Sequence, residues 1–160
     1  RIEQTYGAPG EVLVAIWGLE TDFGVNVGKF PTIRALATLA YDCRRAEQFR
    51  GELLDALRIV DRGDLQPGEM RGAWAGEIGQ TQFMPKNILA YGTGNLDVAA
   101  NALASTANFL RANGWKAGAG YQPGEPNFVA IEAWNAAGVY QKAIALMGRQ
   151  IDGGGSAAER

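Results

Sequence analysis

The chain has 160 residues, 47% hydrophobic and 20% charged, and its 15 basic and 17 acidic side chains leave a net charge of −2 without a basic block. This composition is typical of one globular domain with a single core, and it excludes a disordered tail, a collagen-like repeat, a coiled coil and a nucleic-acid-binding groove. Histidine is absent and cysteine occurs once, which excludes histidine-activated nucleophiles, histidine zinc ligands, CxxC metal sites and intrachain disulfides, so carboxylate chemistry remains.

Three helices are predicted in the first part of the chain. Residues 11–20, EVLVAIWGLE, are apolar on nearly every face and predict a buried helix, although their β-branched residues leave a buried strand as an alternative. Residues 32–42 predict a second, short helix with Thr32 as its N-cap. Residues 44–63 repeat apolar side chains at three- and four-residue steps and predict the clearest helix, which ends at Gly63.

The middle of the chain alternates between irregular and helical stretches. Residues 64–85 are rich in glycine, yet they are too apolar for a solvated linker, so we predict a loop that the fold holds in place. Residues 86–92 predict a short turn. Residues 97–113 predict a helix capped by Asp97.

The last part of the chain predicts a glycine-rich connection over residues 115–126 and a helical region over residues 127–151 that breaks at Gly138. Because we find neither an internal repeat nor alternating strands and helices, the pattern predicts an all-α, mainly helical single domain with glycine-rich functional loops over residues 1–151. Residues 152–160, DGGGSAAER, predict a flexible C-terminal tail.

The apolar runs of this chain are short, and its first residues do not resemble a charged start followed by an apolar signal core. No apolar run approaches the ~20 residues that a membrane-spanning helix needs, so we expect no membrane span in this chain. The opening residues RIEQTYG are typical of the end of a helix already under way, and we therefore expect an upstream segment in a longer precursor.

Glu20 is the first candidate for chemistry, because it lies where an apolar helix meets the polar turn TDFG. A carboxyl beside Trp17 and Phe23 is poorly hydrated, and poor hydration raises its pKa toward the range of a general acid. The alternative is an ordinary glutamate at the end of a helix. We interpret the neighbouring Asp22 as a capping or loop-closing group.

The stretch GEIGQTQFMP offers a second group of polar side chains. Glu77, Gln80 and Gln82 could bind the amides and hydroxyls of a sugar, with Phe83 and Met84 as an apolar wall. The alternative is a loop whose glutamines hold backbone groups.

Arg44 and Arg45 lie at the start of a predicted helix, where the helix dipole disfavours cations. Either an anionic ligand holds them, or they pair with Asp42, Glu47 or Glu20.

Trp134, Asn135 and Tyr140 lie near the predicted helix break. Aromatic side chains with a polar edge line many carbohydrate clefts, but they are also normal core residues. We interpret Cys43 as a small buried hydrophobic residue.

Around these residues the sequence resembles a known family, the lytic murein transglycosylases of the membrane-bound type B. Members of this family cleave the glycan strands of peptidoglycan. Five segments from Tyr6 to Ile151 carry the resemblance in the family's order: VAIWGLETDFG, LATLAYDCRRAEQF, GAWAGEIGQTQFMP, ASTANFLRANGW and PNFVAIEAWNAAGVY.

The resemblance implies a lysozyme-like helical domain and a carbon–oxygen lyase with Glu20 as its sole catalytic acid and base. This residue would cleave the β-1,4 bond between N-acetylmuramic acid and N-acetylglucosamine and form 1,6-anhydromuramic acid. The implied substrate-binding residues are Arg44, Arg45, Gln82, Asn135 and Tyr140, with Trp134 as a wall. We expect the partner to be peptidoglycan glycan strands and the protein to be a monomer in the periplasm or cell envelope, with a lipid anchor in the full-length precursor.

Three departures from the family pattern concern the site. Ala73 stands where the best-known members have a serine, so a hydrogen bond that orients Glu20 is absent or comes from another group. Phe109 replaces a family tyrosine. Between Lys86 and Asp97, where relatives often have an acidic DxDGDG-like loop, this chain has no acid before Asp97, so we expect neither a metal nor another cofactor.

Two other functions remain open at this point. One is a muramidase, a hydrolase in which Glu77 or Asp22 supplies a second carboxylate ~5 to 9.5 Å from Glu20 and activates water. The other is a catalytically silent glycan-binding module, which the departures at Ala73 and Phe109 make plausible.

Overall fold

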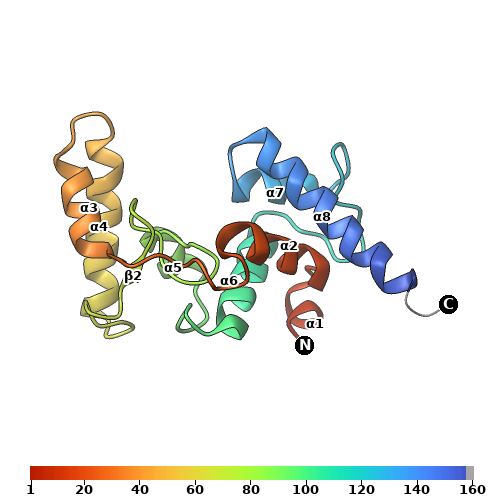
Figure 1. Ribbon diagram of the computed structural model, residues 1–160, viewed down its shortest axis with the longest axis horizontal. Coiled ribbons are helices and arrows are strands. Elements are labelled where there is room, and N and C mark those ends of the chain that lie inside the picture. The colour runs from red at the N-terminus through yellow and green to blue at the C-terminus, as the bar shows by residue number, and fades with distance from the viewer. Residues whose placement is uncertain (158–160) are drawn as a thin grey trace.

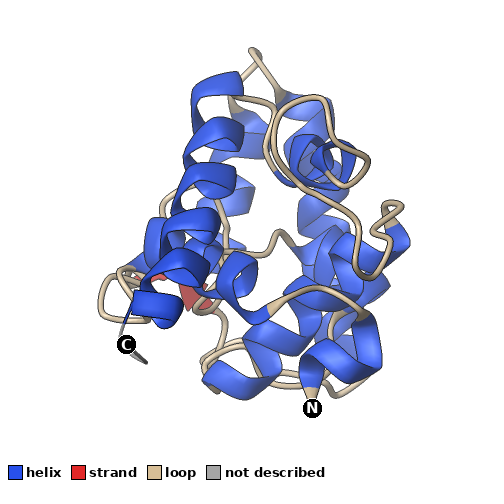
Figure 2. Cartoon of the chain, turned by 90° about the vertical axis from the view of Figure 1, so that its right-hand side faces the viewer, coloured by secondary structure: helices blue, strands red, loops and turns tan. Residues whose placement is uncertain are grey.

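The computed structural model describes residues 1–157, with side chains up to Gly153. These residues form an elongated molecule with a lobe at each end (Figure 1), and helices make up most of it (Figure 2). The hairpin of α3 (Thr32–Tyr41) and α4 (Ala46–Asp61) stands at one end. The other end gathers α1 (Ile2–Tyr6), α2 (Gly10–Thr21), α7 (Phe128–Trp134) and α8 (Gly138–Ala157), and between the ends lie α5 (Pro85–Tyr91) and α6 (Ala99–Ala112). None of the described helices is long and apolar enough to cross a membrane.

The hydrophobic interior is divided into two clusters instead of the single core that the sequence predicts. One cluster joins α2, α6, α7 and α8, and its fully buried members include Val12, Ile16, Leu110, Ile131 and Ile144. The other joins α3 and α4 to the following loop, and its members include Leu36, Phe49, Ile59 and Met70. Ile88 of α5 packs against both clusters. A polar region can therefore lie at the junction without cutting through a continuous core.

Helix α2 confirms the predicted buried helix, and the strand alternative is wrong. It packs against α8 and α6, which bury its apolar residues on several sides. Pro9 precedes the first turn, and Asp22 ends the helix in the left-handed conformation with its N–H donating to Gly18 O at 2.9 Å. Asp22 is therefore a cap, as expected, although through its backbone. The last turn of α2 carries Glu20.

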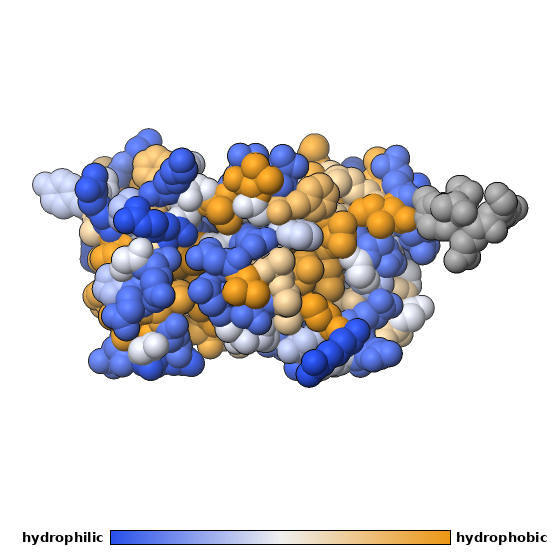
Figure 3. Space-filling model, turned by 60° about the horizontal axis from the view of Figure 1, so that its bottom comes forward, coloured by the Kyte–Doolittle hydropathy of each residue, from blue (hydrophilic) through white to orange (hydrophobic). Residues whose placement is uncertain are grey.

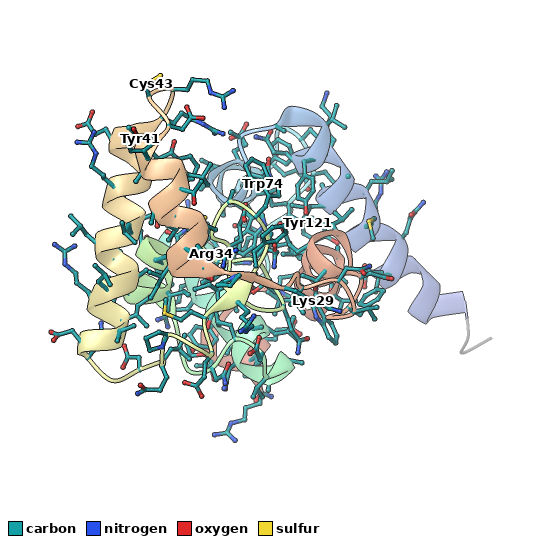
Figure 4. The ribbon with its side chains drawn as sticks, turned by 60° about the vertical axis from the view of Figure 1, so that its left-hand side comes forward. Lys29, Arg34, Tyr41, Cys43, Trp74 and Tyr121 are labelled. Carbon is teal, nitrogen blue, oxygen red and sulfur yellow. The ribbon has the colours of Figure 1, made fainter. Side chains whose placement is uncertain are left out.

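The α3–α4 hairpin confirms two predicted helices but corrects two residues. Thr32 is the first residue of α3 and not its N-cap; Pro31 holds that position, and the buried Thr32 hydroxyl has no partner among the described residues. Cys43 is exposed instead of buried, because the turn between the helices projects beyond their packed faces (Figure 4). Hydrophilic residues predominate at this end of the molecule (Figure 3).

Two predictions about the middle elements are wrong. The sequence predicts a turn over residues 86–92, but Pro85 begins the helix α5, since proline fits the first helical position and Ile88 packs inward. Helix α6 begins at Ala99 after Val98, and Asp97 does not cap it. The Asp97 N–H instead donates to Asn95 Oδ1 at 2.9 Å, so this residue belongs to the preceding turn.

The predicted break in the last helical region is confirmed, because residues 135–137 separate α7 from α8, which begins at Gly138. Helix α8 continues through Ala157, so residues 152–157 are helical where the sequence suggested a flexible tail over residues 152–160. Each further residue of a formed helix adds a hydrogen bond, which favours such an extension. Residues 158–160 lie outside the described residues, and the domain boundary at residue 151 stays a prediction.

The glycine-rich loop over residues 64–85 is held in place, as predicted. Its short strand β2 (Arg71–Gly72) pairs antiparallel with β1 (Phe30–Pro31), a pairing that the sequence did not predict. Single bridges then join Ile78 to Gly72 and to Phe83. Met70, Ile78 and Phe83 are buried, and the loop is thereby fixed against α2 and α3.

Gly79 marks the closest approach of this loop to the segment before α6. Its φ of +78° is left-handed, and a Cβ there would collide with Leu96. Gly63 has nearly the same φ, +76°, but its Cβ would meet open space.

We expect Gly63→Ala to lower the free energy of unfolding by about 1–2 kcal/mol, the cost of a left-handed alanine. Gly79→Ala should lower it by about 1–3 kcal/mol more, because Leu96 must also move. Urea unfolding of both variants measures the difference, and equal losses would contradict the close packing described for this loop.

Candidate active site

A cavity of about 270 Å³ lies at the junction of the two lobes. It is formed where the end of α2, the loop before α5, α5 itself, α6 and the end of α7 meet. Its lining residues are Glu20, Glu77, Gln82, Phe83, Met84, Asn87, Phe109, Trp134 and Asn135. The structure thus brings Glu20 together with three of the substrate-binding residues that the resemblance implies, Gln82, Trp134 and Asn135. Glu77, Phe83 and Met84, which the sequence also selects, line the same cavity.

Glu20 is half-buried, and its Oε1 accepts a hydrogen bond of 2.9 Å from the Trp134 indole Nε1. Burial raises the pKa of the Glu20 carboxyl above its ordinary value, the Trp134 hydrogen bond opposes the rise, and the negative charge of Glu77 adds to it. The net direction is upward, so Glu20 keeps its proton to higher pH than an exposed glutamate. It can therefore donate a proton from a poorly hydrated position.

Tyr140 of α8 lies beside Glu20 but does not line the cavity. Its hydroxyl is buried and has no partner within hydrogen-bond geometry among the described residues. Burial, followed by the negative charge of Glu20, raises the pKa of Tyr140 well above its ordinary value. The phenol therefore stays protonated and keeps a donor close to the carboxyl.

Three aromatic rings form one wall of the cavity. The Trp134 ring centroid lies 5.4 Å from that of Phe83 and 5.1 Å from that of Phe109. Phe109 also packs edge-on against Tyr91 at 5.0 Å. This packing fixes the indole, so the hydrogen bond to Glu20 has a rigid donor.

The Trp134 donor was not foreseen from the sequence, which indicated only a wall. Ala73 has no hydroxyl to orient Glu20, and Trp134 supplies the hydrogen bond from another element. A partly buried indole N–H usually finds a hydrogen-bond acceptor, and this rule is the only sequence-based indication that Trp134 would donate to a nearby group.

The two glutamines of the loop have different roles. Gln82, at a left-handed φ of 56°, uses its Nε2 to donate to Val27 O at 3.1 Å and to Gly79 O at 3.0 Å, and its Oε1 accepts from none of the described residues. Gln80 lies outside the cavity, where its Oε1 accepts from Trp17 Nε1 at 2.9 Å. The alternative that the glutamines hold backbone groups is therefore correct for both side chains, since Gln80 Nε2 also donates to Asp97 O at 2.6 Å. The Oε1 of Gln82 remains available as an acceptor among the described residues.

Asn135 lies in the break between α7 and α8 and lines the cavity. Its Oδ1 accepts from Ala137 N–H at 2.9 Å, and its backbone carbonyl accepts from Gln141 Nε2 at 2.7 Å. These contacts fix the turn after Trp134 and leave the Asn135 amide nitrogen without a partner among the described residues.

Arg44 and Arg45 do not line this cavity. They border a second hollow of about 160 Å³ together with Asp42 and Trp74. The Arg44 guanidinium pairs with the Asp42 carboxylate at 2.6 Å and lowers the pKa of Asp42 to about 2, while Arg45 lies over the Phe49 ring at 5.3 Å. The alternative that Arg44 pairs with Asp42 is correct, and the role of both arginines in a sugar cleft stays a prediction.

Of the two carboxyls considered as partners for Glu20, Glu77 shares its cavity and Asp22 does not. Glu77 Oε2 accepts from Ala75 N–H at 3.1 Å, within the tight turn that also joins Ala73 N–H to Glu77 O. Asp22 is exposed at the end of α2.

The residues that precede α6 do not fit a calcium site. Their oxygens are occupied by amide donors: Asn95 O accepts from Asn101 Nδ2, Leu96 O from Gln80 N–H, and Asp97 O from Gln80 Nε2. The described part of the chain holds no group of three acidic or cysteine side chains that could bind a metal. Asp97 is the one acid of this segment, and calcium prefers several.

Comparisons with known proteins agree with this architecture. Residues 1–124 match the model of a family described as transglycosylase SLT domain. Membrane-bound lytic murein transglycosylase B from Escherichia coli (strain K12) is 37% identical over 142 residues, which cover 79% of this chain and 39% of that protein. The chain thus spans about two fifths of the length of this curated relative.

Solved structures share the fold. SltB3 from Pseudomonas aeruginosa in complex with NAG-anhNAM-pentapeptide has a TM-score of 0.88 and 28% identity, covering 95% of this chain and 59% of that one. The lytic transglycosylase Slt35 from Escherichia coli in complex with calcium has a TM-score of 0.83 and 28% identity, covering 93% and 68%. The predicted mainly helical, lysozyme-like fold is confirmed.

The raised pKa of Glu20 predicts a pH-dependent effect on stability. Because the folded protein holds this proton more tightly than the unfolded chain, wild-type stability falls as pH rises from the unfolded pKa through the folded pKa. Glu20→Gln is neutral throughout, so its melting temperature should match the wild type near pH 4, exceed it increasingly as pH rises through the folded pKa of Glu20, and then keep a constant lead. Differential scanning fluorimetry across this range measures the trend.

Glu132→Gln is the matched control, since it removes an exposed carboxyl from α7. It should change the melting temperature by a similar amount at every pH. A Glu20→Gln curve as flat as this control would contradict the burial of the Glu20 carboxylate.

Proposed function

The chain belongs to the transglycosylase SLT domain family, and we propose that it is a lytic transglycosylase of peptidoglycan. It would cleave the β-1,4 bond between N-acetylmuramic acid and N-acetylglucosamine and form 1,6-anhydromuramic acid. The observation that carries the proposal is the half-buried Glu20, with its raised pKa, at a cavity between two lobes.

In the first step, protonated Glu20 donates to the glycosidic oxygen as the bond to the anomeric carbon breaks. The acetamido oxygen of the substrate stabilises the positive charge that develops at that carbon. Burial supports this step, because it favours the neutral carboxyl before transfer.

In the second step, the Glu20 carboxylate removes the proton from the muramyl 6-hydroxyl, whose oxygen bonds to the anomeric carbon and closes the anhydro ring. Glu20 is then protonated again. The Trp134 N–H donates to Glu20 and stabilises the carboxylate that exists between the two steps. Attack from within one bound sugar is strongly favoured over attack by free water, so no second protein carboxylate is required.

The lining of the cavity suits a sugar with acetamido groups. Trp134 offers an aromatic face, and Gln82 and Asn135 place an amide oxygen and an amide nitrogen at its edge. Tyr140 supports Glu20 from α8. We propose that Arg44 and Arg45 hold a more distant part of the strand, since their hollow adjoins the same loop through Trp74.

We further propose that the protein acts in the periplasm or cell envelope, where its substrate lies. Its relative in Escherichia coli is named as membrane-bound. The lipid anchor and the monomeric state stay predictions. The relative Slt35 is described in complex with calcium, but the segment before α6 here does not fit that ion, and no step depends on a metal.

A muramidase is the second candidate, because Glu77 shares the cavity with Glu20. In that reaction Glu77 would activate water, and the released strand would end in reducing muramic acid. The tight turn that fixes Glu77 is compatible with either reaction, so the chemical form of the released product is needed to distinguish them.

Mass spectrometry of a sacculus digest distinguishes the two reactions. We expect fragments that end in 1,6-anhydromuramic acid, one water lighter than hydrolysis products and unchanged by borohydride. A majority of borohydride-reducible ends would favour the muramidase, and a complete lack of fragments would favour the silent glycan-binding module.

Glu20→Gln should lower turnover on sacculi at least about 100-fold, because one residue performs both proton transfers. Asp22→Asn, at the same end of α2, is the control. It should lower turnover much less, since Asp22 caps the helix through its backbone N–H and not through its carboxylate. Near-normal turnover of a folded Glu20→Gln protein would refute the assignment of Glu20.

A further inference from the structure

A third hollow, of about 300 Å³, lies at the start of α3. The β1–β2 register sets Phe30 opposite Gly72, and Trp74 follows two residues later at the apex of a tight turn. This pairing brings together two aromatic side chains that are 44 residues apart in sequence. Figure 4 shows Trp74 and Arg34 on the same side of the molecule. We call this site the Trp74 hollow; its walls include Phe30, Pro31, Arg34, Thr38, Leu39 and Trp74.

The Trp74 hollow is apolar but carries one free cation. Trp74 is 60% exposed and Phe30 is 56% exposed. Apolar side chains that gather on a surface in this way usually mark a binding site. The Arg34 guanidinium has no ion pair or hydrogen bond among the described residues. The Thr38 hydroxyl already donates to Arg34 O at 2.9 Å. The hollow thus offers two aromatic faces, aliphatic walls and a single strong donor group.

The hollow is connected to the candidate active site through one turn. Ala73 N–H donates to Glu77 O at 3.1 Å, so the turn from residue 73 to residue 77 is closed. Trp74 at its apex borders both the Trp74 hollow and the Arg44–Arg45 hollow, and Glu77 at its end lines the Glu20 cavity. One tight turn therefore contributes Glu77 to the Glu20 cavity and Trp74 to the Trp74 hollow.

The chemistry of the hollow favours a peptide over a sugar. A sugar ring needs several hydrogen-bond partners, and this site offers one guanidinium beyond its apolar walls. A peptide with small apolar side chains and a carboxylate matches it, since a guanidinium binds a carboxylate through two parallel hydrogen bonds. SltB3, which shares this fold, is described with glycan fragments that carry a pentapeptide.

We propose that the Trp74 hollow binds the carboxylate-bearing peptide branch of the glycan strand, with Arg34 on the carboxylate and Phe30 and Trp74 against the apolar side chains. This inference rests on the proposed function. It makes the protein an enzyme that prefers peptide-bearing strands to bare ones.

Steady-state kinetics on two substrates test the inference. The substrates are peptide-bearing glycan strands and the same strands after an amidase has removed the peptides. Arg34→Gln and Phe30→Ala change the hollow without touching the Glu20 cavity. Each should raise KM about tenfold on the peptide-bearing strands, because Arg34→Gln removes a charge-assisted contact and Phe30→Ala removes an apolar one. Each should leave turnover of bare strands unchanged.

Arg50→Gln, which removes an exposed cation from α4, is the matched control and should change neither KM. An equal rise in KM on both substrates would assign the hollow to sugar and overturn the inference. An unchanged KM for both variants would overturn it while leaving the proposed function intact. Complete inactivity of the wild type on both substrates would overturn the proposed function and this inference with it.

Discussion

The burial of one carboxyl against one indole N–H is the interaction on which the rest of the site depends. Burial favours protonated Glu20, and Trp134 favours the carboxylate, so the same side chain is suited to give and to take a proton. The burial of Glu20 in the fold and its hydrogen bond to Trp134 both depend on segments that are distant in the sequence. Helices α6 and α8 enclose α2, and the break between α7 and α8 sets the indole across from it.

Gln80 holds this arrangement from behind the cavity, because it joins three segments. Its Oε1 accepts from Trp17 and its backbone carbonyl from Thr21 at 2.6 Å, both on α2 near Glu20. Its N–H and Nε2 donate to the carbonyls of Leu96 and Asp97. The segment before α6, where the resemblance implies an acidic loop in relatives, is therefore fixed here by neutral amides.

Much of the fold and part of the site followed from the sequence, because they depend on local patterns. The buried helix, its polar end at Glu20 and the break after Trp134 are of this kind. The rest depends on contacts between distant segments. The exposure of Cys43 depends on how far a turn projects, the separation of Arg44 from the Glu20 cavity depends on the position of the α3–α4 hairpin, and the Trp134 donor depends on two helices that meet.

The most direct measurement is the pH dependence of kcat/KM for the wild type, Trp134→Phe and Glu77→Gln. Activity requires protonated Glu20, so it falls as pH rises through the Glu20 pKa. Trp134→Phe removes a donor that favours the carboxylate and should move this fall to higher pH. Glu77→Gln removes a negative charge and should move it to lower pH. Profiles that coincide for all three proteins would contradict the account of Glu20 as a buried acid held between these two residues.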